Sequence, residues 1–220
     1  MGKINLVGGV EEAGRGPVIG PMVMAIVVMP KNELDYLKRI GVKDSKLLSP
    51  KQRMELFEKI TSNCEYEYLV VSPEEIDEAL NSSSMNLNLL EAKITSDLIK
   101  KVSVDYVIMD SPSSVPHKHT EIVREYLNKE VELFSEHKAD LNYEIVGAAS
   151  IIAKVIRDEE IEKIKREILY DFGSGYPSDP KTKEFIQTYW DKKPDLFRKT
   201  WKTYKKLKSA NSQKKLNFDK

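Results

Sequence analysis

Short apolar runs rich in β-branched residues alternate along this chain with helical patterns, and this alternation restricts the fold more than any other feature. Runs of that kind fit a pleated sheet, whereas apolar residues three or four positions apart form one face of a helix. Strands that alternate with helices are typical of an α/β domain. The expected strands are Ile4–Val10, Val23–Met29, Asp105–Met109 and Val131–Glu136, and the expected helices include Leu87–Lys101, Ile145–Leu169 and one that ends at Tyr189.

Two further helix starts carry a specific capping pattern. In Ser49-Pro50-Lys51-Gln52 and in Ser72-Pro73-Glu74-Glu75, a serine is followed by proline and then, two residues later, by Gln or Glu. The serine oxygen can accept a backbone N–H of the first turn, while the Gln or Glu side chain can accept the N–H of the serine. Both segments therefore predict the first turn of a helix.

Charge is balanced over the whole chain, which taken alone argues against a nucleic-acid-binding protein. Lys plus Arg and Asp plus Glu each number 35, so the net charge is zero. The window from Leu196 to Leu216, however, holds basic residues and no Asp or Glu. Because a phosphate responds to local charge, this end of the chain could contact nucleic acid. The basic residues are Arg198, Lys199, Lys202, Lys205, Lys206, Lys208, Lys214 and Lys215.

The sequence offers no sign of secretion or membrane insertion. Cys64 is the only cysteine, which fits a reducing compartment. No run approaches the roughly 20 apolar residues of a membrane span, and the N-terminus lacks a signal-peptide pattern. We therefore expect a cytoplasmic protein that does not act at a membrane. In the absence of heptads or a large apolar tail we expect a monomer.

Two adjacent carboxylates, Glu11 and Glu12, follow the first expected strand. Such a pair repels itself unless a cation lies between its members. The turn Gly14-Arg15-Gly16 comes shortly afterwards, and backbone N–H groups of such a turn can approach a phosphate closely. Acids for a metal beside a turn for a phosphate predict a phosphodiester site. The alternative is a pair of solvated surface acids.

Two more acids occupy suggestive positions. Asp110 directly follows another expected strand, and Asp140 precedes the small-residue stretch Ala148–Lys154. Sites in α/β proteins are usually assembled at strand ends, and Mg²⁺ and Mn²⁺ prefer oxygen ligands. Two such ions about 3.5–4 Å apart can hold both the attacking water and the leaving oxygen of a phosphodiester. Considered singly, Asp110 could instead cap a turn and Asp140 could be a solvated loop acid.

Several motifs, taken in order, resemble those of the type 2 ribonucleases H (ribonuclease HII), and of their archaeal branch in particular. The resemblance covers roughly residues 4–204, which is nearly the whole chain. The matching segments are Gly9–Pro21, Val42–Lys46, Asp110–Pro112, His137–Asp140, Ala148–Val155, Gly173–Pro180 and Trp201–Thr203.

The resemblance implies an RNase H-like fold, with a central mixed β-sheet flanked by helices and a helical C-terminal extension. We expect a catalytic domain over residues 1–170, a helical substrate-binding part over 171–210, and a mobile tail over 211–220. The implied activity is hydrolysis of the RNA strand of RNA–DNA hybrids and nicking 5′ of ribonucleotides embedded in duplex DNA. It would use two metal ions, leave 3′-hydroxyl and 5′-phosphate ends, and serve DNA replication and repair.

The family's functional residues fall on defined positions of this chain. Its turn that senses the phosphate and the 2′-OH falls on Gly14, Arg15 and Gly16, and its junction-sensing tyrosine falls on Tyr176. Four further positions are candidate phosphate contacts or, alternatively, plain surface lysines: Lys43, Lys46, Lys138 and Lys202. The family's ligands for Mg²⁺ or Mn²⁺ fall on Glu11, Glu12, Asp110 and Asp140.

One position departs from the family pattern, because Glu11 stands where the usual residue is Asp. The additional methylene moves the carboxylate by about 1 Å, and a misplacement of that size can cost about 10²-fold in rate. A compensated natural variant, an engineered substitution and a weakened enzyme all remain open. The alternative function is a hybrid-binding protein with impaired chemistry. Another nuclease or integrase of the same broad fold is disfavoured by Gly14-Arg15-Gly16 together with Tyr176.

Near the end of the chain, Gln213–Phe218 resembles a sliding-clamp-binding motif, in which Gln is followed by an aliphatic residue and then by an aromatic residue. The aromatic Phe218 stands one position too early, and Asp219 occupies the expected place. A basic mobile tail without a clamp partner is the alternative that this displacement favours.

Overall fold

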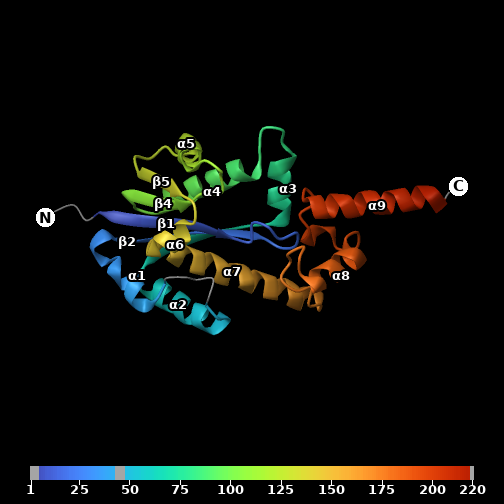
Figure 1. The fold of residues 1–220 in the computed structure, drawn as a ribbon, viewed down its shortest axis with the longest axis horizontal. Helices are drawn as coiled ribbons and strands as arrows, with labels where there is room; N and C mark the ends of the chain where they lie inside the picture. The colour runs from blue at the N-terminus through green and yellow to red at the C-terminus, as the bar shows by residue number, and fades with distance from the viewer. Residues whose placement is uncertain (1–4, 43–47, 219–220) are drawn as a thin grey trace. The chain divides into compact units, whose positions relative to one another are not determined.

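The computed structural model describes residues 5–42 and 48–218, and it confirms a central mixed sheet flanked by helices (Figure 1). The five strands lie in the order β3-β2-β1-β4-β5. Strand β1 is antiparallel to β2 and parallel to β4, and β4 is parallel to β5. The elements are β1 (Leu6–Ala13), β2 (Met22–Pro30), η1 (Lys31–Glu33), α1 (Asp35–Ile40), α2 (Pro50–Asn63), β3 (Glu65–Val71), α3 (Pro73–Asn81), α4 (Leu87–Lys101), β4 (Tyr106–Asp110), α5 (Pro116–Tyr126), β5 (Glu132–Glu136), α6 (Ala139–Asn142), α7 (Glu144–Ile168), α8 (Pro180–Tyr189), η3 (Pro194–Leu196) and α9 (Lys202–Phe218).

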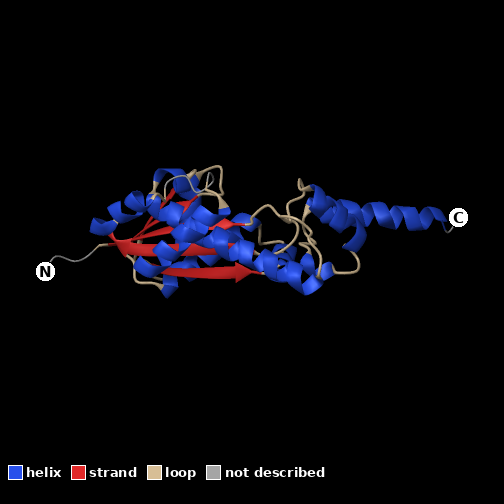
Figure 2. Ribbon diagram, turned by 90° about the horizontal axis from the view of Figure 1, so that it is seen from below, coloured by secondary structure: helices blue, strands red, loops and turns tan. Residues whose placement is uncertain are grey.

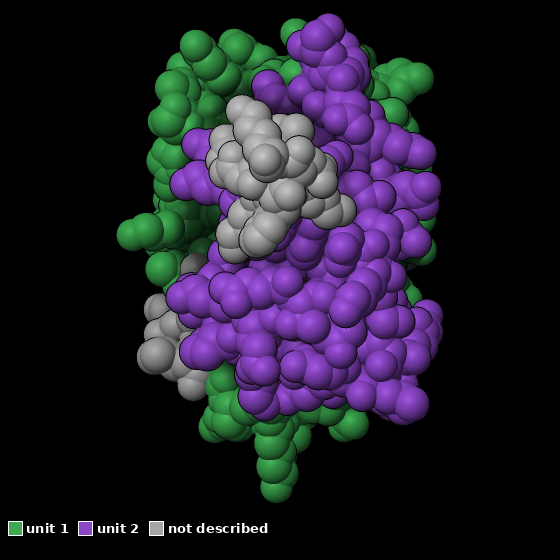
Figure 3. All heavy atoms as spheres, turned by 90° about the vertical axis from the view of Figure 1, so that its right-hand side faces the viewer, with its two compact units in different colours: residues 1–13, 23–70, 87–157 green, residues 14–22, 71–86, 158–220 purple. Residues whose placement is uncertain are grey.

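The chain divides into two compact units, which Figure 3 colours separately. The first comprises residues 1–13, 23–70 and 87–157, and the second comprises 14–22, 71–86 and 158–220. The sequence predicted consecutive parts that meet at residue 170. The two units instead alternate along the chain, since Val18 and Ile19 lie in the same core as Phe185 and Phe197 near the C-terminus. The catalytic and substrate-binding roles expected for the two parts stay predictions.

The first unit is built around the sheet, with helices on both faces (Figures 1 and 2). Helices α1 and α2 and the first part of α7 lie on one face, and α4 and α5 lie on the other. The small residues of α7 pack against the sheet, since Ala148 and Ala149 are fully buried in the core that includes residues of β1, β2 and β4. Small side chains let this helix approach the sheet closely.

The two predicted capping patterns both form. Ser49 Oγ accepts the N–H of Gln52 while Gln52 Oε1 accepts the N–H of Ser49, with N···O distances of 3.3 and 3.0 Å. Ser72 and Glu75 make the same reciprocal pair at 3.2 and 2.8 Å. These bonds satisfy backbone donors that the first helical turn otherwise leaves without a partner.

The second unit has an aromatic core. Phe185 stacks on Tyr189 and on Phe197, with ring centroids 4.7 and 5.9 Å apart. Val18 and Ile19, from the short segment after β1, are fully buried in the same cluster. This shared core explains why the segment that carries Val18 and Ile19 belongs to the second unit.

Three features differ from, or extend, what the sequence predicted. Strand β1 continues to Ala13, so the acidic pair is part of the strand rather than of the connection that follows it. Strand β3 and helix α5 were not among the elements that we expected. Helix α9 runs to Phe218, so the backbone of the predicted tail is helical up to that residue, and its mobility stays a prediction. In the part of the chain that the structure describes, no helix has the length and apolar character required to cross a bilayer.

Candidate active site

The register of the parallel strands brings two of the predicted acids side by side. Val10 of β1 is paired with Met109 of β4, so the next residues of the two strands, Glu11 and Asp110, lie at the same level of the sheet. Side chains at paired positions point to the same face. The register therefore brings these two carboxylates together, and their role as a site stays a prediction.

Glu11 and Glu12 are neighbours in strand β1, so their side chains leave the strand in different directions. Successive side chains of a strand point to opposite faces of the sheet. The face of Glu11 is also the face of Gly9, which is covered by the start of α7: a Cβ at Gly9 would lie 2.4 Å from the backbone carbonyl of Ile145. Glu12 therefore projects from the other face.

Asp140 is brought to the site by a tight connection between β5 and α7. Lys138 adopts a left-handed conformation, with φ of 56°, and turns the chain into the short helix α6. The N–H of Ala139 then donates to Oδ1 of Asp110 at 2.7 Å. This bond fixes the start of α6 against the end of β4, and α6 carries Asp140.

Three of the four predicted acids meet. Among the described residues, carboxylate oxygens of Glu11, Asp110 and Asp140 all lie within 4.8 Å of one another, and Glu12 is outside this group. Glu11 is only 9% exposed, and its Oε2 accepts no hydrogen bond from any described residue. A buried carboxylate oxygen without a donor, with two further carboxylates beside it, is suited to a hard divalent cation.

The charge of the carboxylate cluster also favours a bound cation. Burial raises the pKa of the Glu11 carboxyl well above its ordinary value, and neighbouring carboxylates add to the rise, in the order Glu12, Asp110 and Asp140. Charged acids this close repel one another unless a cation offsets them. The cluster therefore fits a divalent metal ion by its donor atoms and by its charge.

The predicted phosphate-sensing turn lies in the second unit. Gly14 adopts φ of 79°, a left-handed conformation that glycine reaches without strain. A Cβ at Gly16 would lie 3.3 Å from the ring of Tyr176, so the turn and the tyrosine are in contact range. The backbone N–H of Val18 donates to the carbonyl of Gly175 at 2.9 Å. Tyr176 is 39% exposed, which leaves much of its side chain open to solvent.

The structure describes two of the four lysines that are predicted to contact phosphates. Lys138 and Lys202 are both exposed, in the first and second units respectively. Lys43 and Lys46 lie outside the described residues. All four remain predictions.

Sequence reasoning missed the character of Arg198. It was counted with the basic surface of the C-terminal end, yet the structure buries it completely. Charge patterning cannot separate a buried arginine from a solvated one. The flanking aromatics Phe197 and Trp201 are the one local signal that this segment packs inward.

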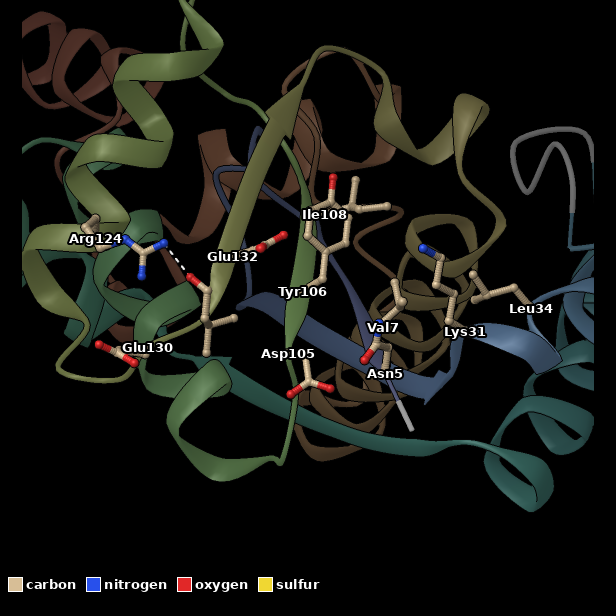
Figure 4. Close-up of a pocket in the computed structure, with 11 residues that line it drawn as sticks. Asn5, Val7, Lys31, Leu34, Asp105, Tyr106, Ile108, Arg124, Glu130 and Glu132 are labelled. Atoms are coloured by element: carbon tan, nitrogen blue, oxygen red, sulfur yellow. Dashed lines mark hydrogen bonds between the residues drawn. The ribbon is translucent and has the colours of Figure 1, made fainter. Parts of the chain in front are cut away.

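Figure 4 shows a separate cavity of about 750 Å³ in the first unit. Its lining includes Tyr106 and Glu132, which are the first residues of β4 and β5. It therefore lies at the opposite ends of these strands from Asp110. Basic and acidic side chains both line it, among them Lys31 and Arg124, and it contains none of the clustered carboxylates.

The chain is similar to several known proteins. The family model described as Ribonuclease HII matches residues 8–204. The chain is 42% identical over 222 residues to Ribonuclease HII of Pyrococcus furiosus, covering 97% of each protein. It is similar to the crystal structure of ribonuclease H2 from Pyrococcus horikoshii OT3, with a TM-score of 0.85, 43% identity, and coverage of 93% of this chain and 98% of that one. The structure of the PCNA:RNase HII complex from Archaeoglobus fulgidus matches with a TM-score of 0.82 and 39% identity, covering 90% of this chain and 95% of that one.

Proposed function

The chain belongs to the ribonuclease HII family, and we propose that it nicks duplex DNA on the 5′ side of embedded ribonucleotides by two-metal catalysis. As a ribonuclease H, it is a divalent-metal-dependent endonuclease that cleaves the RNA strand of RNA–DNA hybrids. The proposed products carry a 3′-hydroxyl and a 5′-phosphate, and the proposed setting is DNA replication and repair in the cytoplasm.

The convergence of Glu11, Asp110 and Asp140 is the observation that carries the proposal. These three residues would hold Mg²⁺ or Mn²⁺, and Glu12 is proposed as a fourth ligand because the family's fourth acid falls on it. When bound, such ions make a bound water more acidic and offset the negative charge that develops on the phosphate. The hydrogen bond from Ala139 to Asp110 keeps one of these carboxylates in place before any substrate arrives.

Recognition of the ribonucleotide is assigned to the turn Gly14–Gly16 and to Tyr176. Backbone N–H groups of the turn can contact a 2′-OH, which distinguishes RNA from DNA. The exposed tyrosine ring can stack on a sugar or base of the junction. Lys43, Lys46, Lys138 and Lys202 are proposed to contact the phosphate backbone. The exposed lysines of α9, among them Lys205 and Lys206, supply further positive charge.

The test compares the protein with Asp110→Asn and Asp140→Asn on an end-labelled RNA–DNA hybrid. We expect metal-dependent cleavage by the unaltered chain, loss of cleavage in both variants, and hybrid binding in all three. The alternative, a hybrid-binding protein with impaired chemistry, is favoured by Glu11 in place of Asp. It predicts binding without metal-dependent cleavage even in the unaltered chain.

A sliding-clamp partner is proposed for the C-terminal end. The similar Archaeoglobus protein was solved in complex with PCNA, and Gln213–Phe218 partly matches a clamp-binding motif. Asp219 lies outside the described residues. We expect an archaeal sliding clamp to pull down the full chain but not a chain that lacks residues 212–220. We also expect light scattering to show that the protein is a monomer in solution.

A further inference from the structure

A buried arginine donates hydrogen bonds to backbone carbonyls of the Gly14–Gly16 turn. Arg198 is fully buried, and its guanidinium donates from Nη2 to the carbonyl of Gly14 at 2.6 Å. Nη1 donates to the carbonyl of Arg15 at 2.9 Å, and Nε donates to that of Gly20 at 3.1 Å. One planar side chain therefore fixes two successive carbonyls of the turn and a third one a few residues later.

Trp201 completes this arrangement from the same segment. Its Nε1 donates to the carbonyl of Gly16 at 3.2 Å, and the guanidinium of Arg198 lies over its ring, 4.8 Å from the centroid. The three consecutive carbonyls of the turn are thus bound by two side chains that also contact each other.

The segment that carries both side chains is itself anchored. Asp77 of α3 is buried and accepts the backbone N–H of Lys199 at 2.6 Å and that of Thr200 at 2.9 Å. The N–H of Arg198 donates to the carbonyl of Val18 at 2.9 Å. The arginine therefore acts from a rigid support, as a precise site requires.

The carbonyl contacts decide where the N–H groups of the turn point. In a trans peptide the C=O and the following N–H point in opposite directions. With the carbonyls of Gly14 and Arg15 directed at Arg198, the N–H groups of Arg15 and Gly16 are directed to the other side. Successive N–H groups arranged in this way form an anion-binding concavity, and the buried positive charge behind the turn strengthens them as donors.

We propose that Arg198 is a positioning residue for ribonucleotide recognition, which aims the N–H groups of the turn and, with Trp201, sets their geometry. The inference rests on the proposed function, because it assumes that the turn reads the ribonucleotide. A purely structural arginine would affect the amount of folded protein, whereas a positioning arginine affects how the folded protein distinguishes its substrates.

The experiment uses the full chain and two DNA duplexes that differ by one 2′-OH. Affinity for each duplex is measured by fluorescence anisotropy in metal-free buffer, and kcat and KM for nicking of the ribonucleotide duplex are measured with Mn²⁺. In Arg198→Gln we expect the affinity ratio to fall toward one, KM to rise about tenfold, and kcat/KM to fall on the order of 100-fold. Arg198→Lys keeps the charge but lacks the planar fork, so it should recover part of the loss.

Two further variants keep the test decisive. Trp201→Phe removes the bond to Gly16 from a partly exposed position, and it should raise KM roughly 2- to 10-fold even if Arg198→Gln fails to fold. Phe185→Leu loosens the core of the same unit without removing a contact to the turn, and it should lower thermal stability while leaving KM and the affinity ratio unchanged.

An unchanged KM and affinity ratio in folded Arg198→Gln and in Trp201→Phe would overturn the positioning role. The same loss of discrimination in Phe185→Leu would overturn it too, since destabilisation alone would then explain the effect. Failure of the unaltered chain to nick the ribonucleotide duplex would instead refute the proposed function, and the inference would fall with it.

Discussion

Glu11→Gln should stabilise the protein in the absence of metal and remove most of the stabilisation that metal provides. The Glu11 carboxylate lies within 4.8 Å of those of Asp110 and Asp140. At an effective dielectric constant of about 20, two unit charges at that distance repel by about 3 kcal/mol. The repulsion of Glu11 by Asp110 and by Asp140 together is therefore larger than the free energy needed to protonate Glu11. Because a glutamate carboxyl has an ordinary pKa of 4.5, protonating Glu11 at pH 7 costs about 3 kcal/mol. Glutamine is neutral without this cost, so about 3 kcal/mol is the upper limit of the stability gained by Glu11→Gln.

The gain should depend on pH in a defined direction. Because the pKa of Glu11 is raised in the folded state, the unfolded chain releases this proton first as pH rises above 4.5. The folded metal-free protein therefore loses stability from that pH upward. Glu11→Gln should be nearly neutral at pH 4.5 and stabilising by up to about 3 kcal/mol near pH 7.

Urea unfolding in EDTA at both pH values, repeated at pH 7 with Mn²⁺, measures these quantities. Glu58→Gln is the matched control, since it makes the same chemical change on the exposed side of α2. The reasoning is refuted if Glu11→Gln is less stable than the unaltered chain in EDTA at pH 7. It is equally refuted if Mn²⁺ stabilises both proteins by the same amount.

Three other predictions follow from particular residues. Glu11→Asp should raise the Mg²⁺-dependent rate of hybrid cleavage on the order of 10²-fold, because it restores the usual carboxylate length, and equal initial rates would contradict this. Gly9→Ala should cost about 1–3 kcal/mol in urea unfolding, because its Cβ would lie 2.4 Å from the backbone of α7, and a change of less than about 0.5 kcal/mol would show that the helix yields freely. Burial lowers the pKa of His119 from 6.5 to about 4, so the unfolded chain takes up a proton in this range before the folded one does. Stability should therefore fall by up to about 3 kcal/mol as pH drops from 6.5 to about 4, and His119→Asn, compared by urea unfolding at several pH values, should lack this component.

Local sequence signals predicted the framework of the site well. Capping at Ser49 and Ser72 depends on residues three positions apart, and the strand that leads to Asp110 depends on a continuous apolar run, so neither needs long-range information. The end of β1 was less predictable. Glu11 and Glu12 look like loop residues by composition, but pairing with Ala25 and Met24 of β2 extends the strand through them.

Long-range packing explains what the sequence could not reveal. That segment 14–22 joins the C-terminal core depends on contacts such as the antiparallel bridge between Ile19 and Phe197. The burial of Arg198 depends on carbonyls of residues far earlier in the chain, and no charge pattern encodes that pairing. Only the folded arrangement separates this arginine from the solvated lysines of α9.

The central claim is tested most directly by one duplex DNA that carries a single ribonucleotide, incubated with Mn²⁺ and with both fragment ends mapped. The account predicts one cut on the 5′ side of the ribonucleotide, a 3′-hydroxyl on the upstream fragment, a 5′-phosphate on the fragment that carries the ribonucleotide, and no cut in the all-DNA duplex. Binding without a metal-dependent cut, a cut on the 3′ side, or equal cutting of the all-DNA duplex would contradict it.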